Sequence, residues 1–270
     1  MAKTASDQQG PKWRLGVVSY LNARPLIAGL EADPAVQLVF DVPASLPLLL
    51  EGGGVDAALI PVIDLVHPDR GWRILSDACI GCDGETLTVR VFSRVSPKGV
   101  RRLHVDGHSH TSVALANIIW REVFGQRLDI LPYRGPQTSE HCEAVLLIGD
   151  KVVNNNLVDF EVQTDLGQAW KSLTRLPFVF AVWACGSDVP DELALTQRLS
   201  AARDAGVRSA ELIAADFGPG MGWPVNLAKR YLTNRLKFTL GPRHREGMAK
   251  FFELARKHEI IPSSRGHVLV

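Results

Sequence analysis

The sequence predicts an α/β protein with two lobes, a central cleft and two strands that cross between the lobes. Three observations predict this fold class. The length, 270 residues, suits two domains of roughly 100–150 residues, each able to bury its own core. Strand and helix patterns alternate over residues 14–61 and again over 101–148, which is typical of parallel sheets covered by helices. Segments 73–93 and 176–184 have the apolar character of strands that cross between two sheets.

Composition and charge favour a small-molecule ligand. The chain has 30 Lys and Arg residues against 29 Asp and Glu residues, and no basic run is longer than two residues. This balance excludes the electrostatic signature of a protein that binds nucleic acid or an acidic membrane surface. Residues 1–12 lack the apolar centre of a signal peptide, and no stretch of about 18 apolar residues occurs. We therefore expect a cytoplasmic protein with a disordered leader at residues 1–12, and the sequence leaves its oligomeric state open.

The first half of the chain predicts a parallel sheet with a ligand crevice after its first strand. Residues 55–61 form an unbroken apolar run, which indicates a strand buried on both faces. Because ligands bind beyond the carboxyl ends of parallel strands, we expect Ser19 and Asn22 at the crevice. The expected strands are 14–19, 37–42 and 55–61, and the expected helices are 25–30 and 46–51.

A second α/β series begins after residue 100. It predicts a helix at 111–124 and, on both sides of it, the strands 101–105, 128–132 and 144–148. A helix at 166–173, the long apolar strand 176–184 and the helices 191–217, 226–231 and 243–258 follow. We therefore expect a discontinuous first domain at residues 13–93 and 184–270, on which the tail packs, and an inserted second domain at residues 94–183.

Residues 106–112, with the sequence DGHSHTS, join a predicted strand to a predicted helix and form a candidate anion site. The free N–H groups and the positive dipole end of a helix start attract an anion. The hydroxyls of Ser109, Thr111 and Ser112 add three potential donors. The alternative is that these residues only cap the helix, since Ser and Thr are common N-caps. His110 in the same turn is either a base or a residue that faces solvent.

The cysteines and histidines predict neither a metal nor a cofactor. Four cysteines, Cys79, Cys82, Cys142 and Cys185, are too few and too scattered for a disulfide scaffold. Cys79 and Cys82 have the spacing of a redox or zinc motif, but no helix pattern follows them and no second pair completes four ligands. Whether these two thiols ever pair is left open.

Several short segments follow one another in an order that is specific for one family. They are 19–26 (SYLNARPL), 54–61 (GVDAALIP), 109–115 (SHTSVAL), 146–150 (LLIGD), 165–170 (DLGQAW), 176–183 (LPFVFAVW) and 231–235 (YLTNR). Over roughly residues 13–260 they resemble the chorismate dehydratase family, a set of enzymes in the futalosine route to menaquinone. The match in order along the chain carries the resemblance, because each segment alone is a weak signal.

The resemblance implies a type II periplasmic-binding-protein fold used as a cytoplasmic enzyme. It implies that chorismate loses water to give 3-[(1-carboxyvinyl)oxy]benzoate, without a cofactor or a metal, so the only partner expected is a small-molecule substrate. Two alternatives stay open. One is 1,4-dihydroxy-6-naphthoate synthase of the same pathway, which shares the fold, and the other is a non-enzymatic solute-binding protein for small anions.

The resemblance also implies which residues act on the substrate. Thr88 matches a position where the family commonly has Ser, and Asn22 and Thr88 are expected to orient the reacting group. Asp150, at the end of a predicted strand, is the candidate base by position. The alternatives are that Asp150 caps a turn, or that the substrate's own enolpyruvyl carboxylate takes the proton. Substrate binding is assigned to Ser19, Asn22, Thr88, Ser109, His110, Thr111 and Ser112.

Overall fold

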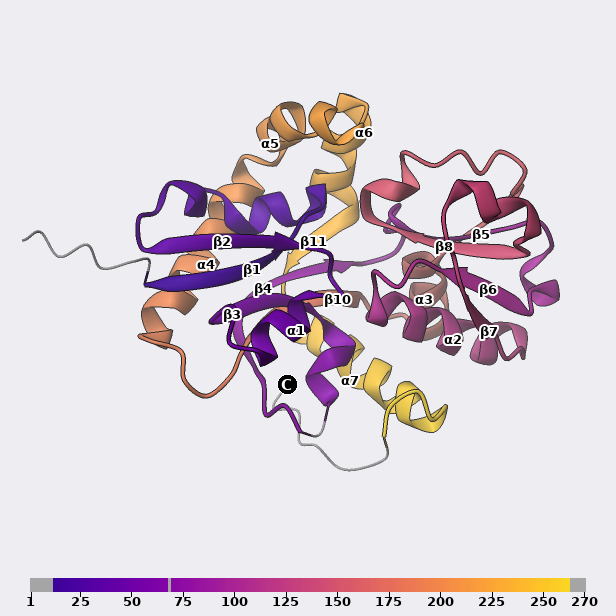
Figure 1. Cartoon of the computed structure of the whole chain (residues 1–270), viewed down its shortest axis with the longest axis horizontal. Helices are drawn as coiled ribbons and strands as arrows, with labels where there is room; N and C mark the ends of the chain where they lie inside the picture. Colours follow the sequence, from indigo (N-terminus) through magenta and orange to yellow (C-terminus); the bar gives the residue numbers. More distant parts are fainter. Residues whose placement is uncertain (1–11, 68, 263–270) are drawn as a thin grey trace, which may run out of the picture.

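Two sheets in two lobes form the framework of the protein, in a computed structural model that describes residues 12–67 and 69–262. Figure 1 shows the first lobe on the left and the second on the right. The first sheet has the strand order β11-β4-β10-β3-β1-β2, and the second has the order β7-β6-β8-β5-β9. The predicted α/β architecture with two sheets is confirmed.

The first sheet combines parallel and antiparallel strands. Its members are β1 (Trp13–Val18), β2 (Val36–Asp41), β3 (Ala57–Pro61), β4 (Arg73–Cys82), β10 (Phe178–Cys185) and β11 (Leu236–Thr239). Strand β1 pairs in parallel with β2 and β3, whereas β10 runs antiparallel to β3 and β4. Every residue of β3 is buried, as its apolar run predicts.

The second sheet is smaller and has the same mixed character. Its members are β5 (Val89–Ser93), β6 (Arg102–Val105), β7 (Asp129–Pro132), β8 (Ala144–Ile148) and β9 (Val162–Asp165). Strand β6 pairs in parallel with β7 and β8, and β5 runs antiparallel to β8 and β9. The carboxyl end of β8 therefore points toward the first lobe, where a ligand crevice is expected.

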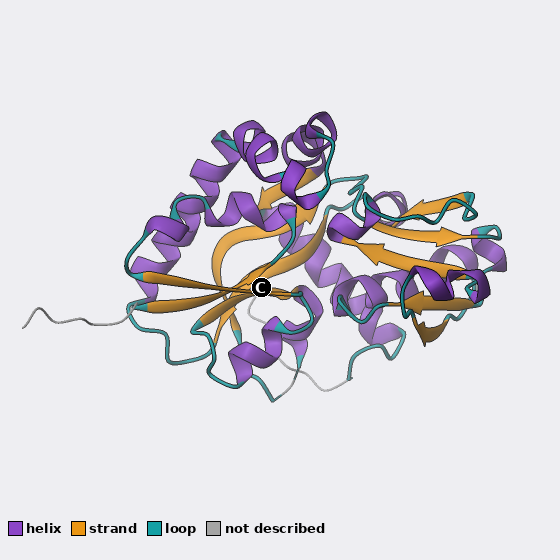
Figure 2. Ribbon diagram, turned by 45° about the horizontal axis from the view of Figure 1, so that its top comes forward, coloured by secondary structure: helices purple, strands orange, loops and turns teal. Residues whose placement is uncertain are grey.

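Helices surround the first sheet and pack beside the second (Figure 2). The α-helices are α1 (Leu46–Glu51), α2 (His110–Phe124), α3 (Leu166–Thr174), α4 (Glu192–Arg208), α5 (Ala210–Phe217), α6 (Val225–Arg230) and α7 (Pro242–Lys257). Shorter turns matter for the site: η1 (Leu21–Ile27), η3 (Val62–Val66), η6 (Gly149–Val152) and the π-helical η8 (Tyr231–Arg235). Ser109 and Asp165 cap α2 and α3 through their side chains, as short polar residues do before a helix.

The sheets divide the chain at other points than the expected domain boundaries. Strand β5, expected in the first domain, hydrogen-bonds only with strands of the second sheet. Strand β10, expected mostly in the second domain, belongs to the first sheet. An apolar run shows that a strand is buried but not which strand it pairs with, so both were placed by sequence order. We propose that the chain crosses between the two lobes near residues 83–88 and 175–177.

Smaller differences concern short or broken elements. Strands β9 and β11 lie outside the strands that the sequence predicts. The segment expected as a helix at 25–30 overlaps only the second half of the 3₁₀ turn η1, in which Pro25 has no N–H to donate. The helix expected at 191–217 is broken at Ser209 into α4 and α5. The predicted leader lies, except for Lys12, outside the described residues.

The helices after β10 pack on the first lobe, and α7 also reaches the second. Helix α4 lies against η1 and β4, and α7 contacts both β10 and α2. No helix in residues 12–67 and 69–262 is long and apolar enough to cross a membrane.

The packing of α4 on η1 gives a stability prediction. At Gly206 in α4, a methyl group would overlap the backbone carbonyl oxygen of Pro25. We expect Gly206→Ala to lower the free energy of unfolding by about 1–3 kcal/mol, since overpacking forces backbone shifts. Gly220→Ala is the matched control, because nothing lies within 4 Å of the added carbon there. Urea unfolding of both variants measures the difference, and equal effects would contradict the packing argument.

Candidate active site

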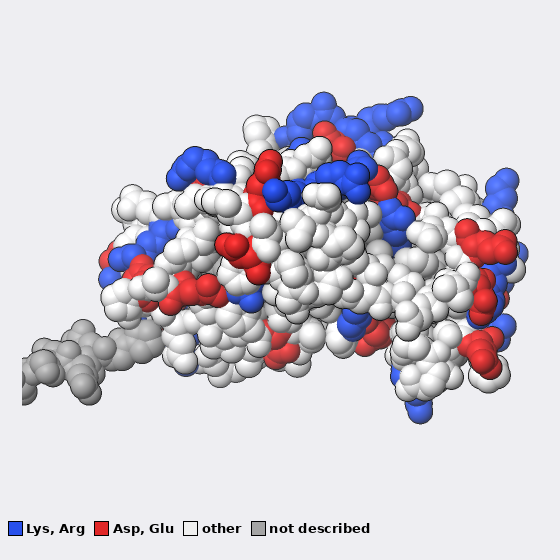
Figure 3. All heavy atoms as spheres, turned by 90° about the horizontal axis from the view of Figure 1, so that it is seen from above, with Lys and Arg blue, Asp and Glu red and all other residues white. Residues whose placement is uncertain are grey.

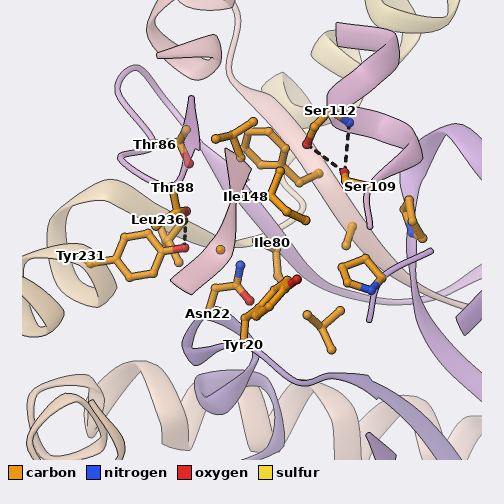
Figure 4. A pocket seen from close by; sticks show the side chains of 17 residues that line it. Tyr20, Asn22, Ile80, Thr86, Thr88, Ser109, Ser112, Ile148, Tyr231 and Leu236 are labelled. Carbon is orange, nitrogen blue, oxygen red and sulfur yellow. Dashed lines mark hydrogen bonds between the residues drawn. The ribbon is translucent and has the colours of Figure 1, made fainter. Parts of the chain in front are cut away.

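A cavity of about 50 Å³ lies between the two lobes, next to the ends of β1, β3 and β8. Much of its lining is apolar, but polar side chains from both lobes also face it (Figure 4): Tyr20, Asn22, Thr86, Thr88, Ser109, Ser112 and Tyr231. The cavity therefore has this lining only while the two lobes are together.

Asn22, Thr88 and Tyr231 form one wall of the cavity. Asn22 lies in η1 directly after β1, where the sequence predicts a crevice residue. The Thr88 Oγ1 and Tyr231 Oη atoms lie 2.6 Å apart, within hydrogen-bond distance, and both residues are 1% exposed. Burial raises the pKa of the Tyr231 phenol, and hydrogen bonds with Thr88 and Asn22 oppose this shift without cancelling it. The Tyr231 hydroxyl therefore keeps its proton at neutral pH.

The turn that carries Thr88 is held by Asp165. The two carboxylate oxygens of Asp165 accept the backbone N–H groups of Thr86 at 3.1 Å and Leu87 at 2.8 Å. One of them also accepts the N–H of Gln168 in the first turn of α3. Leu87 has a φ of 72°, a left-handed conformation that is costly for a residue with a side chain. The carboxylate fixes this turn and thereby the position of the Thr88 hydroxyl.

The start of α2 forms the opposite wall. Ser109 is the N-cap: its Oγ accepts the Ser112 N–H at 3.1 Å and donates to the Ser112 Oγ at 2.8 Å. The hydrogen of the Ser112 hydroxyl is therefore left for a ligand. Ser109 therefore caps the helix, and Ser109 and Ser112 at its N-terminal end also line the cavity.

Three predicted binding residues do not line this cavity. Ser19 is exposed at the end of β1. Thr111 Oγ1 accepts the backbone N–H of Ile63 at 3.3 Å, and His110 Nδ1 lies 2.9 Å from Asp64 Oδ2. Because Ile63 and Asp64 belong to η3 of the first lobe, these contacts of Thr111 and His110 join the lobes.

Asp150 lies behind the cavity and is absent from its lining. Its carboxylate accepts the backbone N–H of Leu21 at 3.3 Å and the Trp223 indole N–H at 2.9 Å. Burial raises the pKa of Asp150, and these two donors act in the opposite direction. The geometry therefore favours the alternative that Asp150 caps a turn, here the start of η1 in the other lobe.

The cavity contains no charged side chain among the described residues that line it. Lys151, two residues after the lining residue Gly149, is paired: its Nζ lies 2.5 Å from Asp106 Oδ2 and 2.7 Å from His108 Nδ1. His108 in turn bonds the Tyr20 hydroxyl at 3.2 Å across the lobes. On the surface, acidic and basic side chains are interspersed over the face in Figure 3. An anionic ligand would meet neutral donors and a helix dipole.

Sequence reasoning missed Tyr20, Thr86 and Tyr231 as lining residues. Tyr20 and Tyr231 stand in two of the segments that carry the family resemblance, so their place there was the available signal. Thr86 precedes Thr88 by two positions, but the left-handed Leu87 between them interrupts any strand, so the alternation of side chains along a strand could not have indicated Thr86. The Thr86 Oγ1 is buried and has no hydrogen-bond partner within the described part of the chain. It is a further polar group that a ligand can satisfy.

None of the four cysteines is among the described residues that line the cavity. Cys79, Cys82 and Cys185 are buried, free thiols, Cys142 is buried as well, and burial raises the pKa of Cys79 to about 12. Cys79 and Cys82 belong to β4 instead of preceding a helix. Across residues 12–67 and 69–262, no three His, Cys, Asp or Glu side chains are grouped to hold a metal ion.

Comparison with known proteins identifies relatives along nearly the whole chain. A family model described as menaquinone biosynthesis matches residues 13–257. A protein of Thermus thermophilus named chorismate dehydratase is 28% identical over 257 residues, which cover 88% of this chain and 93% of the relative. The family resemblance drawn from the short sequence segments is thereby confirmed.

Solved structures share the fold at lower identity. A protein of Archaeoglobus fulgidus has a TM-score of 0.71 and 17% identity, with 92% of this chain and 98% of that chain covered. The periplasmic aliphatic sulphonate-binding protein of Escherichia coli has a TM-score of 0.61 and 12% identity, with 93% of each chain covered. These likenesses confirm the predicted periplasmic-binding-protein-like fold.

The contact between His110 and Asp64 gives a prediction for the dependence of stability on pH. The hydrogen bond with Asp64 raises the pKa of His110 above 6.5 in the folded protein. Its contribution is therefore complete below pH 6.5 and is lost as pH rises through the folded-state pKa. We expect His110→Gln to cost up to about 1 kcal/mol at pH 5.5, discounted because the side chain is 47% exposed, and almost nothing at pH 9.

Urea unfolding of wild type and His110→Gln at the two pH values measures this difference. His141→Gln, at an exposed histidine of the second lobe, is the control for removing any imidazole. A cost of His110→Gln that is the same at pH 5.5 and pH 9 would contradict the assigned contact.

Proposed function

Because the chain belongs to the menaquinone-biosynthesis family, whose model matches residues 13–257, we propose that it is a chorismate dehydratase. The observation that carries the proposal is the similarity to the Thermus thermophilus protein of that name along 88% of the chain. The reaction removes water from chorismate and gives 3-[(1-carboxyvinyl)oxy]benzoate. The enzyme is then a carbon–oxygen lyase whose partner is a small dicarboxylate.

The two polar walls of the cavity suit such a substrate. The start of α2, with the free hydroxyl hydrogen of Ser112, binds the carboxylate of the ring. Asn22 and Thr88 on the opposite wall orient the end of the ring where the reaction occurs. The apolar lining between them, with Ile80, Ile148 and others, covers the ring itself.

The chemistry requires a polarised ring carboxylate more than a strong acid or a metal. The proton that is removed lies on the ring carbon that carries the enolpyruvyl ether, and conjugation to the ring carboxylate makes it acidic. Donors at that carboxylate stabilise the negative charge that develops, by roughly 2.7–4 kcal/mol for each well-placed donor. Loss of the neighbouring hydroxyl then makes the ring aromatic, which supplies much of the driving force.

The substrate supplies its own base in this proposal. Both oxygens of Asp150 lie within 3.3 Å of the Leu21 N–H, and Trp223 donates to one of them, so the carboxylate is engaged away from the cavity. No other carboxylate is among the described lining residues. The enolpyruvyl carboxylate, which lies next to the reacting carbon within chorismate, takes the proton.

An activity assay tests the proposed function. The purified protein is incubated with chorismate, and the aromatic product is followed by absorbance and by the mass of one lost water. Turnover that falls steeply in Asn22→Ala and Thr88→Ala supports the assignment. Binding of chorismate without turnover would indicate a solute-binding protein, and no reaction with chorismate would favour the naphthoate synthase of the same pathway.

Asp150 distinguishes the two candidate bases. We expect Asp150→Asn to lower turnover less than about 10-fold, because the amide oxygen can still accept from Trp223 while the lobes lose only part of one contact. Steady-state kinetics with a folding check by circular dichroism measures the effect. A loss of several orders of magnitude in a folded variant would assign the proton transfer to Asp150 and contradict the substrate-assisted route.

Ser112 tests the anion site. We expect Ser112→Ala to weaken binding of the aromatic product about 10-fold, since a hydrogen bond to a charged oxygen is lost while the Ser109 cap remains. Calorimetric titration measures the affinity. Ser172→Ala on the exposed face of α3 is the control, and equal affinities of both variants would remove Ser112 from the site.

A further inference from the structure

The Tyr231 hydroxyl lies at the centre of a three-residue cluster in the cavity wall. It is 2.6 Å from Thr88 Oγ1, and the Asn22 amide is the other neutral polar group that acts on the pKa of its phenol. All three residues line the cavity, and Figure 4 shows Thr88 and Asn22 on either side of the hydroxyl. The Tyr231 ring stacks on Trp223 with centroids 4.8 Å apart, which fixes where the hydroxyl lies.

The number of hydroxyl and amide hydrogens in this cluster determines which donors and acceptors remain free for a ligand. A neutral phenol donates one hydrogen and accepts another. The Asn22 nitrogen points toward Tyr231 (Figure 4), and an amide nitrogen only donates. Tyr231 therefore accepts from Asn22 and donates to Thr88. This leaves the Thr88 hydrogen free, together with Asn22 Oδ1, which is buried and has no partner among the described residues.

The result is the same if the Asn22 amide is turned over. Tyr231 then donates to the Asn22 oxygen and accepts the Thr88 hydrogen, so Asn22 offers an N–H and Thr88 offers a lone pair. Because the phenol carries one hydrogen, it always polarises its two neighbours in opposite senses. In both arrangements the wall presents one donor and one acceptor next to each other.

We propose that Asn22 and Thr88 form a subsite for a hydroxyl group, with Tyr231 as the positioning residue, and that this hydroxyl is the one chorismate loses. A hydroxyl both donates and accepts, so it satisfies both groups at once. A carboxylate only accepts hydrogen bonds. One of its lone pairs would therefore face the buried acceptor lone pair of Asn22 or Thr88. The proposal rests on the dehydratase function above and assigns the carboxylates elsewhere, one of them to Ser112.

The subsite also favours the reaction. As the carbon–oxygen bond breaks, the departing oxygen gains negative charge, and the hydrogen bond donated to it strengthens in the transition state. Holding the hydroxyl fixes the ring, which keeps the neighbouring enolpyruvyl carboxylate beside the carbon whose proton it takes. In this way Asn22 and Thr88 orient the carboxylate without contacting it.

Comparing the effect of a variant on the substrate with its effect on the product distinguishes this role from a structural one, because the aromatic product lacks the hydroxyl. We expect Tyr231→Phe to lower kcat/KM for chorismate at least about 10-fold, as expected when an orienting hydrogen bond in the transition state is lost. The inhibition constant of the product, measured on the remaining activity, is expected to stay within about twofold. Tyr133→Phe, a half-buried tyrosine outside the cavity, is the control and is expected to leave both constants unchanged.

A second pair of variants keeps the test decisive if Tyr231→Phe does not fold. Thr88→Val keeps the shape and removes the hydroxyl, and is expected to lose kcat/KM while keeping product inhibition. Thr88→Ser keeps the hydroxyl and is expected to restore most of kcat/KM.

Two results would overturn the subsite. One is unchanged kcat/KM in Tyr231→Phe and Thr88→Val, and the other is product affinity that falls in parallel with kcat/KM, which indicates general damage to the site. A wild-type protein that does not convert chorismate would instead reject the proposed function. The wild-type assay therefore separates the two failures.

Discussion

Two carboxylates at the junction of the lobes hold the cavity in shape. Asp165 accepts three backbone N–H groups, two from the turn before Thr88 and one from α3, while Asp150 ties the end of β8 to η1 and Trp223. Removing such carboxylates from water is costly, and burial raises the pKa of both, so they depend on these donors. The wall formed by Asn22, Thr88 and Tyr231 is therefore positioned by contacts that lie outside the lining.

The described lining likewise offers a ligand hydrogen-bonding groups and no charged side chain. A dicarboxylate could be bound by arginine or lysine, but the described lining residues are neutral. Hydroxyls, one amide and a helix start provide hydrogen bonds with a fixed direction, which distinguish a hydroxyl from a carboxylate in a way that a point charge does not. A cavity with such donors is also less prone to hold any anion indiscriminately. Specificity then depends on the direction of a few hydrogen atoms, above all that of Tyr231.

The fold could be predicted from the sequence because its signals are local: the apolar run of β3, the hydroxyl-rich start of α2, and the order of strands and helices. Sheet membership of β5 and β10 could not, since pairing is decided by distant strands. A strand end predicts Asn22 at the cavity, a helix start predicts Ser109 and Ser112, and the family resemblance implies Thr88. Tyr231 comes from a π-helical turn far along the chain, so no local pattern connects it to Thr88.

The most direct test of the account is a crystal structure of the protein with the aromatic product bound. The account predicts the product between the lobes, with an oxygen of its ring carboxylate within about 3.2 Å of Ser112 Oγ. The ring carbon that lost the hydroxyl is predicted to face Asn22 and Thr88. A product bound outside this cavity, or one with a carboxylate seated between Asn22 and Thr88, would contradict it.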